Sequence, residues 1–251
     1  MLRQLAVAGA IAVPVVGLPE RKGDARMCGR YTVRAPGQIA LRFGVPEASV
    51  DGAATAEARY NVAPSQAVPV VVARDGGRAV QALSWGFRPA WMRDPQKPAP
   101  INARAETLLE RPLFKGAVLG HRCLVPADGF YEWQVRPGQK RNQPYYIRLR
   151  DESLFAFAGL YTGPSGSSPG TCVLITTAPN ELMVPFHDRM PAILRPEDEA
   201  AWLDPELRQA EIVTSLLRSY PEELMVAYPV GPLVSTVAND GPALVEPQVV
   251  S

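Results

Sequence analysis

The strongest constraint on the fold is a series of short apolar runs, rich in β-branched and aromatic residues and bounded by turn-forming residues. Two of them, AVPVVVA at 67–73 and AVQALSW at 79–85, are separated by Arg-Asp-Gly-Gly, which is typical of a β-hairpin turn. Comparable runs follow at 121–134 (two short strands around Ala127-Asp128-Gly129), 143–150, 153–162, 171–177 and 223–230. Because they do not alternate regularly with helical segments, the sequence predicts an α+β fold. We expect a single compact, β-rich domain with a mostly antiparallel sheet and peripheral helices.

The predicted helices are few and short. Residues 36–45 have the pattern of a short amphipathic helix, and 101–112 are expected to start extended and then turn helical. In PEDEAAWL and PELRQAEIVTSLLRS, proline stands near the start and acidic residues occupy the first turn, as at helix N-termini. The Gly/Ser/Pro-rich run at 163–170 predicts a flexible turn.

Composition limits the possible classes of function. The hydrophobic content of 47% and the charged content of 20% are ordinary for a soluble globular protein with a sizeable core. The three cysteines, Cys28, Cys123 and Cys172, are odd in number and widely spaced, so they form neither a disulfide framework nor a zinc motif, which favours a reducing compartment such as the cytoplasm. With a net charge of +1, any binding of nucleic acid must depend on a local basic patch.

The stretch RMCGRYT at 26–32 reads like the beginning of a protein rather than its interior. Upstream, residues 5–18 form an apolar segment that is too short to span a bilayer and, after Arg3, resembles the core of a signal peptide. This segment could be a secretory signal, a real extension, or upstream sequence translated from a wrongly chosen start. The last explanation is preferred, so residues 1–26 are expected to be a non-native or cleaved extension and 27–251 the working domain.

An N-terminal cysteine has a chemistry that an internal one lacks. If Met27 is an initiator and is trimmed, Cys28 carries a thiol and a free α-amine on adjacent carbons. The reference pKa of such an amine is about 7.7–8.0, so a useful fraction is neutral and nucleophilic near pH 7. The amine can form a Schiff base with an aldehyde, and the thiol can then close a five-membered thiazolidine. The alternative interpretation of Cys28 is a small buried residue near the start of a strand.

Two further residues are candidates for proton transfer. Glu132 stands between Tyr131 and Trp133 in a predicted strand, where a carboxyl group is partly desolvated, and desolvation raises the pKa of a carboxyl group. His187 lies in PFHDRMP, a loop bracketed by prolines, and histidine is the usual proton shuttle near neutral pH. The alternatives are an outward-facing glutamate and an ordinary loop histidine.

The segment INARAE at 101–106 contains an amide and a cation two positions apart. If the segment is extended, Asn102 and Arg104 point to the same face. An asparagine that orients a sugar and an arginine that binds phosphate would make a sensible pair. The alternative is a helix cap followed by a solvated arginine.

Aromatic side chains alternate with arginine in SWGFRPAW at 84–91, which contains Trp85, Phe87, Arg88 and Trp91. Bases of single-stranded nucleic acid stack on such rings. For Trp85, a place at the edge of the core is an equally good interpretation.

Seven segments resemble, in order, the successive motifs of the SOS response-associated peptidase (SRAP) family of abasic-site processing proteins. The segments are MCGRYT, RYNVAPSQ, SWGFRPAW, INARAET, CLVPADGFYEW, HDRMPAIL and NDGPALVEP. They run from residue 27 to about residue 247, although VSTVANDG, at the start of the last one, is looser than the family's pattern. The resemblance implies a compact β-rich domain that needs neither metal nor cofactor.

The resemblance also implies roles for individual residues. Cys28 would form a thiazolidine with the ring-opened sugar of an abasic site in single-stranded DNA, giving a crosslink that shields the lesion. Asn102 would position the sugar, Glu132 would transfer protons and His187 would assist opening of the sugar ring. The contacts to phosphates and bases would come from Arg30, Arg104, Arg189, Trp85 and the Phe87–Pro89 region. We expect a cytoplasmic monomer that associates with the nucleoid through DNA and not with membranes.

One departure from the family keeps other functions open. Residues 1–26 precede Met27, and in the intact chain Cys28 has an amide nitrogen that cannot form a thiazolidine. Loss of the extension would resolve this, either through a corrected start or through proteolysis. A second hypothesis is therefore a cysteine-type peptidase or amidohydrolase that removes its own leader with Cys28 as nucleophile. A third is a noncatalytic module that binds single strands in a salt-sensitive way.

Overall fold

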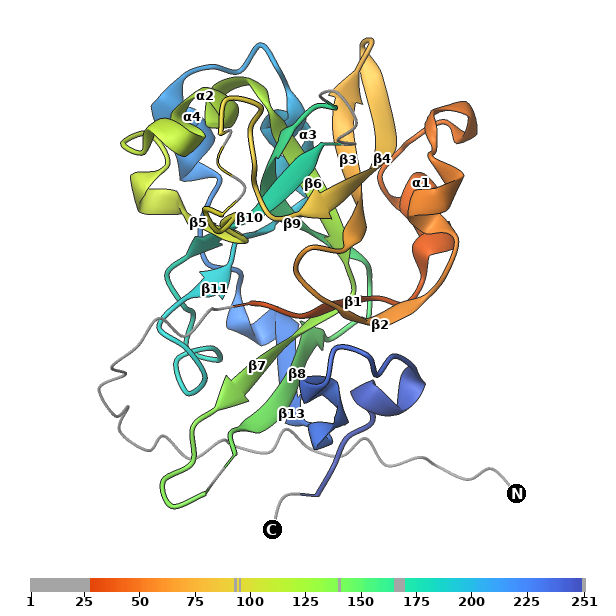
Figure 1. The fold of residues 1–251 in the computed structure, drawn as a ribbon, viewed down its shortest axis with the longest axis vertical. Helices are drawn as coiled ribbons and strands as arrows, with labels where there is room; N and C mark the ends of the chain where they lie inside the picture. Colours follow the sequence, from red (N-terminus) through yellow and green to blue (C-terminus); the bar gives the residue numbers. More distant parts are fainter. Residues whose placement is uncertain (1–27, 93, 95, 140, 165–169, 250–251) are drawn as a thin grey trace.

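The structure is a computed structural model that describes residues 28–92, 94, 96–139, 141–164 and 170–249. The prediction for residues 1–26 lies outside this range, as does most of the turn predicted at 163–170. The predicted α+β class is confirmed, because two sheets form the body of the protein and short helices surround the larger one (Figure 1).

The larger sheet has eight strands in the order β11-β10-β4-β3-β6-β9-β12, with β5 paired to β10. Because β9 also pairs with β10, the central strands close into a ring. The pairings of β10 with β4 and β5 are parallel, and the others in this sheet are antiparallel. The strands are β3 (Ala67–Arg74), β4 (Gly77–Trp85), β5 (Asn102–Arg104), β6 (Arg122–Ala127), β9 (Phe155–Thr162), β10 (Thr171–Thr177), β11 (Met190–Pro191) and β12 (Ile193–Leu194).

The hairpin predicted between 67 and 85 is confirmed as β3 and β4, which pair from Ala67 with Ser84 to Arg74 with Gly77. At its turn, Asp75 and Gly76 have φ angles of 50° and 76°. Positive φ at both central residues is what a two-residue hairpin turn of type I′ requires, and Asp-Gly tolerates it. Local turn chemistry therefore sets this register.

The smaller sheet is antiparallel throughout, in the order β13-β8-β7-β1-β2. Its strands are β1 (Tyr31–Val33), β2 (Arg59–Val62), β7 (Gly129–Gln134), β8 (Gln143–Leu149) and β13 (Met225–Pro229). The β7–β8 hairpin projects away from the larger sheet, toward the bottom of Figure 1.

Two strands were predicted around Ala127-Asp128-Gly129, and both are present as β6 and β7. They belong to different sheets, because β6 pairs with β3 and β9 whereas β7 pairs with β1 and β8. Asp128 is thus the residue at which the chain crosses from one sheet to the other.

The α-helices are α1 (Ile39–Arg42), α2 (Pro112–Gly120), α3 (Glu199–Leu203) and α4 (Ala210–Ser215). Short 3₁₀ helices occupy connections: η1 (Pro36–Gln38), η2 (Glu47–Ser49), η3 (Gly52–Thr55), η4 (Ala105–Thr107), η5 (Pro196–Asp198), η6 (Glu222–Leu224), η7 (Pro232–Ser235) and η8 (Pro242–Val245). Across the described ranges, no helix combines the length and the apolarity needed to cross a bilayer.

Two helix predictions were wrong in their bounds. The helix expected within 101–112 is only the 3₁₀ turn η4, and α2 begins where that segment ends, at Pro112. Proline has no N–H to lose in the first helical turn, so Pro112 starts a helix instead of stopping one. The helix expected soon after Pro205 begins only at Ala210.

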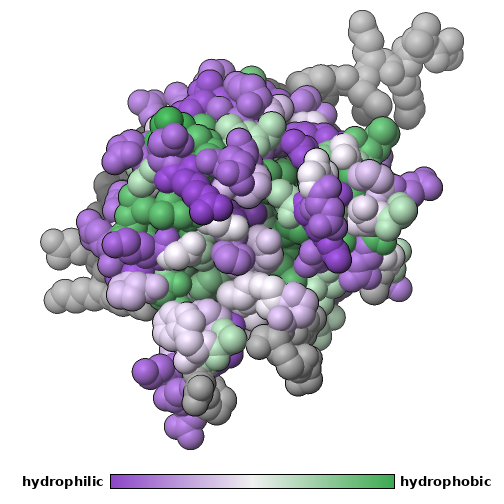
Figure 2. Space-filling model, turned by 90° about the horizontal axis from the view of Figure 1, so that it is seen from above, coloured by the Kyte–Doolittle hydropathy of each residue, from purple (hydrophilic) through white to green (hydrophobic). Residues whose placement is uncertain are grey.

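The main core fills the ring of the larger sheet and extends to the inner face of the smaller one, and it includes Cys28. A second cluster, made of Tyr131, Tyr146, Val230, Val234 and Leu244, joins the smaller sheet to the C-terminal segment. Hydrophilic side chains cover much of the face shown in Figure 2, with apolar ones interspersed.

Candidate functional site

The centre of the candidate site is a contact between Cys28 and Glu132, which are 104 positions apart in the chain. The backbone N–H of Cys28 donates to Oε1 of Glu132 at 2.7 Å. Cys28 precedes β1, and Glu132 lies on β7, which pairs with β1 so that Tyr31 is opposite Phe130. Glu132 is only 4% exposed. Strand pairing thus brings together the two residues that the sequence selected for covalent chemistry and for proton transfer.

The surroundings of Cys28 keep its thiol protonated. Burial raises the pKa of the Cys28 thiol well above its ordinary value, and the negative charge of Glu132 raises it further. Cys28 also has a φ of 43°, which is uncommon for a residue other than glycine. Such a backbone conformation costs on the order of 1–3 kcal/mol and persists only where the surrounding structure enforces it.

The loop that carries His187 lies against the Glu132 strand pair. Tyr145 on β8 is directly opposite Glu132, so the two side chains share one face of the sheet. The ring of Phe186 packs on the ring of Tyr145 with 4.7 Å between centroids, and His187 is the next residue. The structure therefore places the predicted histidine loop beside the strand that carries Glu132.

His187 is buried and holds two contacts through one nitrogen. Its Nδ1 lies 2.7 Å from Oδ1 of Asp188 and 3.1 Å from the backbone nitrogen of Arg189. One nitrogen cannot serve both in the same protonation state: it donates to Asp188 when it carries a proton and accepts from Arg189 when it does not. The contacts to Asp188 and Arg189 therefore fix the orientation of the ring.

Asn102 and Arg104 lie on β5, so the extended conformation predicted for this segment is present. They pair with Leu174 and Thr176 of β10, and the buried Ala103 between them faces the other side. Asn102 is partly buried and Arg104 is exposed. The amide therefore stands nearer the core, with the cation beyond it toward solvent.

Arg189 connects the histidine loop to this region. Its Nη1 and Nη2 atoms bind the two carboxylate oxygens of Glu106, each at 2.8 Å, and Nη2 also donates to the carbonyl of Thr176 at 2.6 Å. The hydrogen bond from Arg189 lowers the pKa of Glu106. The phosphate contact predicted for Arg189 would therefore have to compete with Glu106.

Arg30 has a structural role in this conformation. Its Nη1 donates to Oδ1 of Asn61 at 2.9 Å and to the carbonyl of Val234 at 2.7 Å, which fastens the C-terminal segment to β2. Desolvation by burial lowers the pKa of Arg30. This guanidinium is occupied by protein acceptors rather than presented to a phosphate.

The stacking role predicted for Trp85 and Phe87 was wrong, because each is 1% exposed. The Trp85 indole packs on Tyr31 with 5.3 Å between ring centroids, and Phe87 packs on Phe114 at 5.6 Å. Both rings belong to the core, as the alternative interpretation of Trp85 allowed.

Trp91 is the aromatic residue of this segment that reaches solvent, with 63% exposure. It was among the aromatics of SWGFRPAW but was not selected as a site residue. The signal that could have found it is its position after Pro89, beyond the end of β4, where strand packing no longer buries the side chains.

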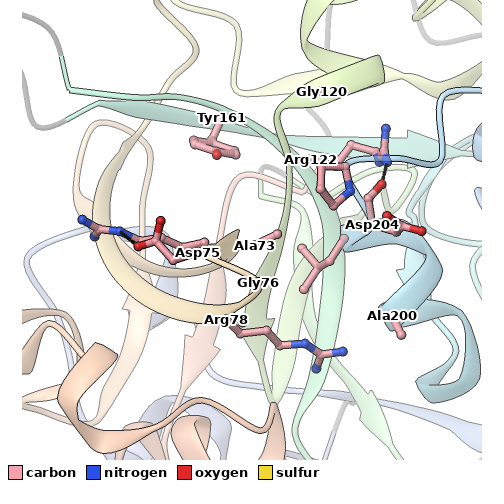
Figure 3. Close-up of a pocket in the computed structure, with 13 residues that line it drawn as sticks. Ala73, Asp75, Gly76, Arg78, Gly120, Arg122, Tyr161, Ala200 and Asp204 are labelled. Atoms are coloured by element: carbon pink, nitrogen blue, oxygen red, sulfur yellow. Dashed lines mark hydrogen bonds and ion pairs between the residues drawn. The ribbon is translucent and has the colours of Figure 1, made fainter.

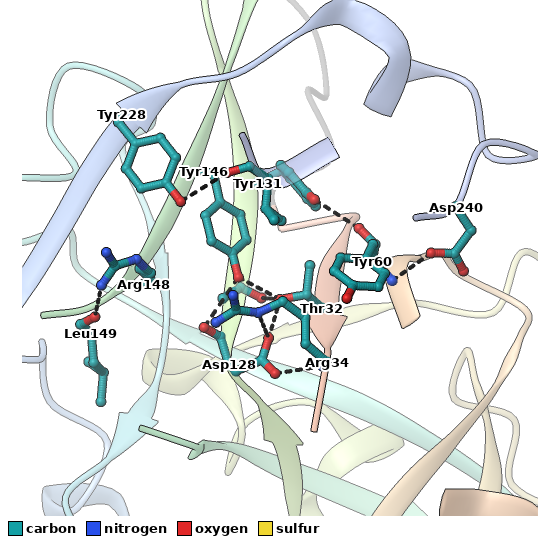
Figure 4. A network of polar contacts seen from close by, with 12 residues as sticks. Thr32, Arg34, Tyr60, Asp128, Tyr131, Tyr146, Arg148, Leu149, Tyr228 and Asp240 are labelled. Atoms are coloured by element: carbon teal, nitrogen blue, oxygen red, sulfur yellow. Dashed lines mark hydrogen bonds and ion pairs between the residues drawn. The ribbon is translucent and has the colours of Figure 1, made fainter. Parts of the chain in front are cut away.

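Sequence reasoning also missed a buried polar network around Asp128 (Figure 4). Oδ1 of Asp128 accepts from Thr32 Oγ1 at 2.5 Å and from Arg34 Nε at 3.0 Å, and Oδ2 accepts from the Arg34 backbone N–H at 2.5 Å. Thr32 Oγ1 and Tyr146 Oη share a hydrogen bond of 2.8 Å, and burial raises the pKa of Tyr146. These bonds fix β1 to the crossing between the sheets, and they thereby support the contact between Cys28 and Glu132.

A cavity of about 470 Å³ lies between the turn of the β3–β4 hairpin and α3, and Arg78, Arg122 and Asp204 line it (Figure 3). The Arg122 guanidinium is bound by backbone carbonyl groups, including those of Val118 and Trp202. None of the predicted site residues lines this cavity, so we do not assign it as the active site. In the part of the chain that the structure describes, no cluster of three His, Cys, Asp or Glu side chains could hold a metal ion.

Comparison with known proteins gives a consistent result. Residues 27–237 match the model of the family described as SOS response associated peptidase (SRAP). The abasic site processing protein YoqW of Bacillus subtilis is 41% identical over 225 residues, covering 88% of this chain and 99% of that protein. YedK of Escherichia coli, also named an abasic site processing protein, is 32% identical over 194 residues, covering 75% and 84%.

A vertebrate relative and a solved structure extend the comparison. The abasic site processing protein HMCES of Gallus gallus is 34% identical over 225 residues, covering 75% of this chain and 66% of that protein. A crystal structure of a protein from Bacteroides thetaiotaomicron has a TM-score of 0.77 and 30% identity, covering 88% of this chain and all of the other.

Proposed function

The chain belongs to the SOS response associated peptidase (SRAP) family, and on this premise we propose that it processes abasic sites in single-stranded DNA by forming a covalent crosslink through Cys28. The observation that carries the proposal is the 2.7 Å contact between the Cys28 nitrogen and Glu132. Once residue 27 and everything before it are lost, that nitrogen becomes an α-amine that already lies against a carboxylate. The start of the family match at residue 27 supports this boundary.

The first step is attack of the amine on the aldehyde of the ring-opened sugar. The nitrogen lone pair forms a bond to the aldehyde carbon, and the carbonyl oxygen leaves as water after it has gained one proton from the amine and one from solvent, the latter being balanced by the thiol proton released in the second step. The product is an iminium ion. Glu132 is in hydrogen-bond reach of the reacting nitrogen, so it can take a proton from the amine and return one to the departing oxygen.

The second step closes the ring. The Cys28 sulfur bonds to the iminium carbon, the C=N electron pair returns to nitrogen, and the thiol proton passes to Glu132. The overall reaction joins amine, thiol and aldehyde and releases one water. Because burial and Glu132 both raise the pKa of this thiol, it enters the reaction protonated and needs a nearby base.

We assign supporting roles to the remaining site residues. His187, on the loop that packs on Tyr145, would transfer a proton during opening of the sugar ring. Asn102 would hydrogen-bond the sugar, and the exposed Arg104 would contact a flanking phosphate. Trp91, rather than Trp85, would stack on a base.

A second candidate function is removal of the chain's own leader at the Met27–Cys28 bond. The positive φ of Cys28 favours it, because φ exists only while a peptide bond precedes Cys28. Cleavage of that bond would therefore release the conformational strain. The raised pKa of the buried thiol disfavours a free thiolate nucleophile, so this function ranks second. If the Cys28→Ala variant of the full-length chain is still cleaved at this bond, self-processing is wrong.

The proposed function is tested with protein whose first residue is Cys28 and a single-stranded oligonucleotide containing one abasic site. We expect a heat-stable adduct on a denaturing gel with the wild type and none with Cys28→Ala. An oligonucleotide without the abasic site is the matched control. The absence of any adduct with a properly folded wild-type protein would contradict the proposal.

A further inference from the structure

Three arginines on the segments that carry or adjoin the candidate site are occupied by the protein's own acceptors. Arg30 binds Asn61 and a backbone carbonyl, Arg34 binds Asp128, and Arg189 binds Glu106 at both carboxylate oxygens. A DNA strand that enters the site still brings a negative charge with every nucleotide. It therefore needs cations that the protein's own acceptors have not already neutralised.

Arg136 meets this requirement. It lies just after β7, in the loop that connects β7 to β8, and its Nη2 donates to Tyr145 Oη at 3.4 Å. Within the described residues, no carboxylate lies at ion-pair distance from Arg136. Its guanidinium therefore keeps N–H donors for a ligand from outside the chain.

Tyr145 links this arginine to the reaction centre. Its side chain shares a face of the sheet with Glu132, directly opposite on the neighbouring strand, and its ring packs on Phe186 beside His187. The phenol oxygen already accepts from Arg136, so its own O–H is left to donate. The phenol oxygen of the buried Tyr145 and the half-buried guanidinium of Arg136 thus lie side by side, on the strand pair that carries Glu132.

We propose that Arg136 and the hydroxyl of Tyr145 together bind one phosphate of the DNA strand next to the abasic nucleotide. Phosphate oxygens can accept hydrogen bonds from both groups at once. A planar guanidinium binds a phosphate, which offers several oxygens, better than it binds one phenol oxygen. This inference rests on the proposed function, because it assigns a subsite for the same DNA substrate. It adds a contact on the β7–β8 hairpin that the motifs at Arg30, Arg104 and Arg189 did not include.

The test uses a single strand with a tetrahydrofuran in place of the abasic sugar, which binds but cannot crosslink. The affinity of this strand for the protein whose first residue is Cys28 is measured by fluorescence anisotropy between 50 and 200 mM salt. For single strands, each phosphate contact contributes about 0.7 to the slope of log K against log salt. Arg136→Gln is expected to reduce the slope by about that amount and to weaken binding about fivefold.

Further variants separate the phosphate contact from a packing role. Arg136→Lys keeps the charge and should keep the salt slope, while Tyr145→Phe removes only the hydroxyl and should weaken binding about threefold at unchanged slope. The double variant Arg136→Gln/Tyr145→Phe should lose less than the product of the two effects, because both groups share one phosphate. The matched control is Arg74→Gln, an exposed arginine beside the turn of the β3–β4 hairpin, which should bind as the wild type does.

The possible outcomes separate this inference from the proposed function. A wild type that binds this strand while Arg136→Gln keeps the full salt slope overturns the phosphate subsite alone. If Arg74→Gln lowers the slope as much as Arg136→Gln, the effect comes from net charge, and the subsite is also wrong. If wild-type protein neither binds this strand nor crosslinks to an abasic one, the proposed function itself fails.

Discussion

Replacing Glu132 by glutamine tests the chemistry of the site most sharply, because it removes a charge and changes almost no volume. The Glu132 carboxylate is 4% exposed and accepts from the Cys28 nitrogen at 2.7 Å. A positioned general acid or base is worth roughly 10²–10⁴ in rate. We therefore expect Glu132→Gln to slow adduct formation by about that factor. Stability should not fall, because a buried amide costs less than a buried carboxylate.

The pH dependence of the same variant has a predicted direction. The negative charge of Glu132 is the second cause, after burial, that raises the pKa of the Cys28 thiol. It also favours the protonated form of an adjacent α-amine. Removing the charge lowers both pKa values, so the rising limb of the pH–rate profile should move to lower pH while the rate at its plateau drops.

The assay is single-turnover crosslinking to an abasic oligonucleotide, followed on denaturing gels from pH 6 to pH 9. Glu132→Asp serves as the partner variant, because its shorter side chain keeps the negative charge but places it farther from the Cys28 nitrogen. The rate of adduct formation should fall less in this variant than in Glu132→Gln. Urea unfolding verifies that both proteins are folded. A Glu132→Gln rate within about threefold of the wild type, with an unshifted profile, would refute the acid–base role.

Three further predictions concern the framework and the DNA contact. Tyr146→Phe removes a hydroxyl bonded to Thr32 at 2.8 Å and should lower the free energy of unfolding by about 1–2 kcal/mol in urea, and an unchanged midpoint would contradict the network. Gly129→Ala should cost about 1–3 kcal/mol or more in the same measurement, because the added Cβ would overlap the Tyr146 ring; wild-type stability would show that this packing is wrong. Trp91→Ala should weaken single-strand binding by about 1–3 kcal/mol without changing the melting temperature, whereas Leu41→Ala, at a side chain that is also exposed but remote in sequence, should change neither; equal losses from both would exclude stacking.

The sequence predicted the features that depend on residues close together in the chain, and it did not predict contacts between distant residues. The β3–β4 hairpin is set by Asp75-Gly76, a local signal, and it was predicted with its turn. Cys28 and Glu132 were each selected by their chemistry, but no local pattern states that residues 104 positions apart meet. Their contact depends on the pairing of β1 with β7 and on the crossing at Asp128.

The errors have the same physical origin. An aromatic side chain next to arginine stacks on bases only if it is exposed to solvent. Tertiary packing determines that exposure, and it buries Trp85 but leaves Trp91 exposed. The phosphate contacts of Arg30 and Arg189 stay predictions, and the protein acceptors with which a phosphate would compete come from segments distant in the sequence. Arg136 was missed for the converse reason, since nothing in its local sequence shows that it reaches Tyr145.

The most direct test of the central claim is the intact mass of the adduct between abasic single-stranded DNA and protein whose first residue is Cys28. A thiazolidine predicts the summed masses of protein and DNA less one water, unchanged by borohydride, and no adduct with protein that retains residues 1–27. An adduct formed equally well by the longer protein, or one that gains two hydrogens on reduction as a Schiff base does, would contradict crosslinking through the free amine and thiol of Cys28.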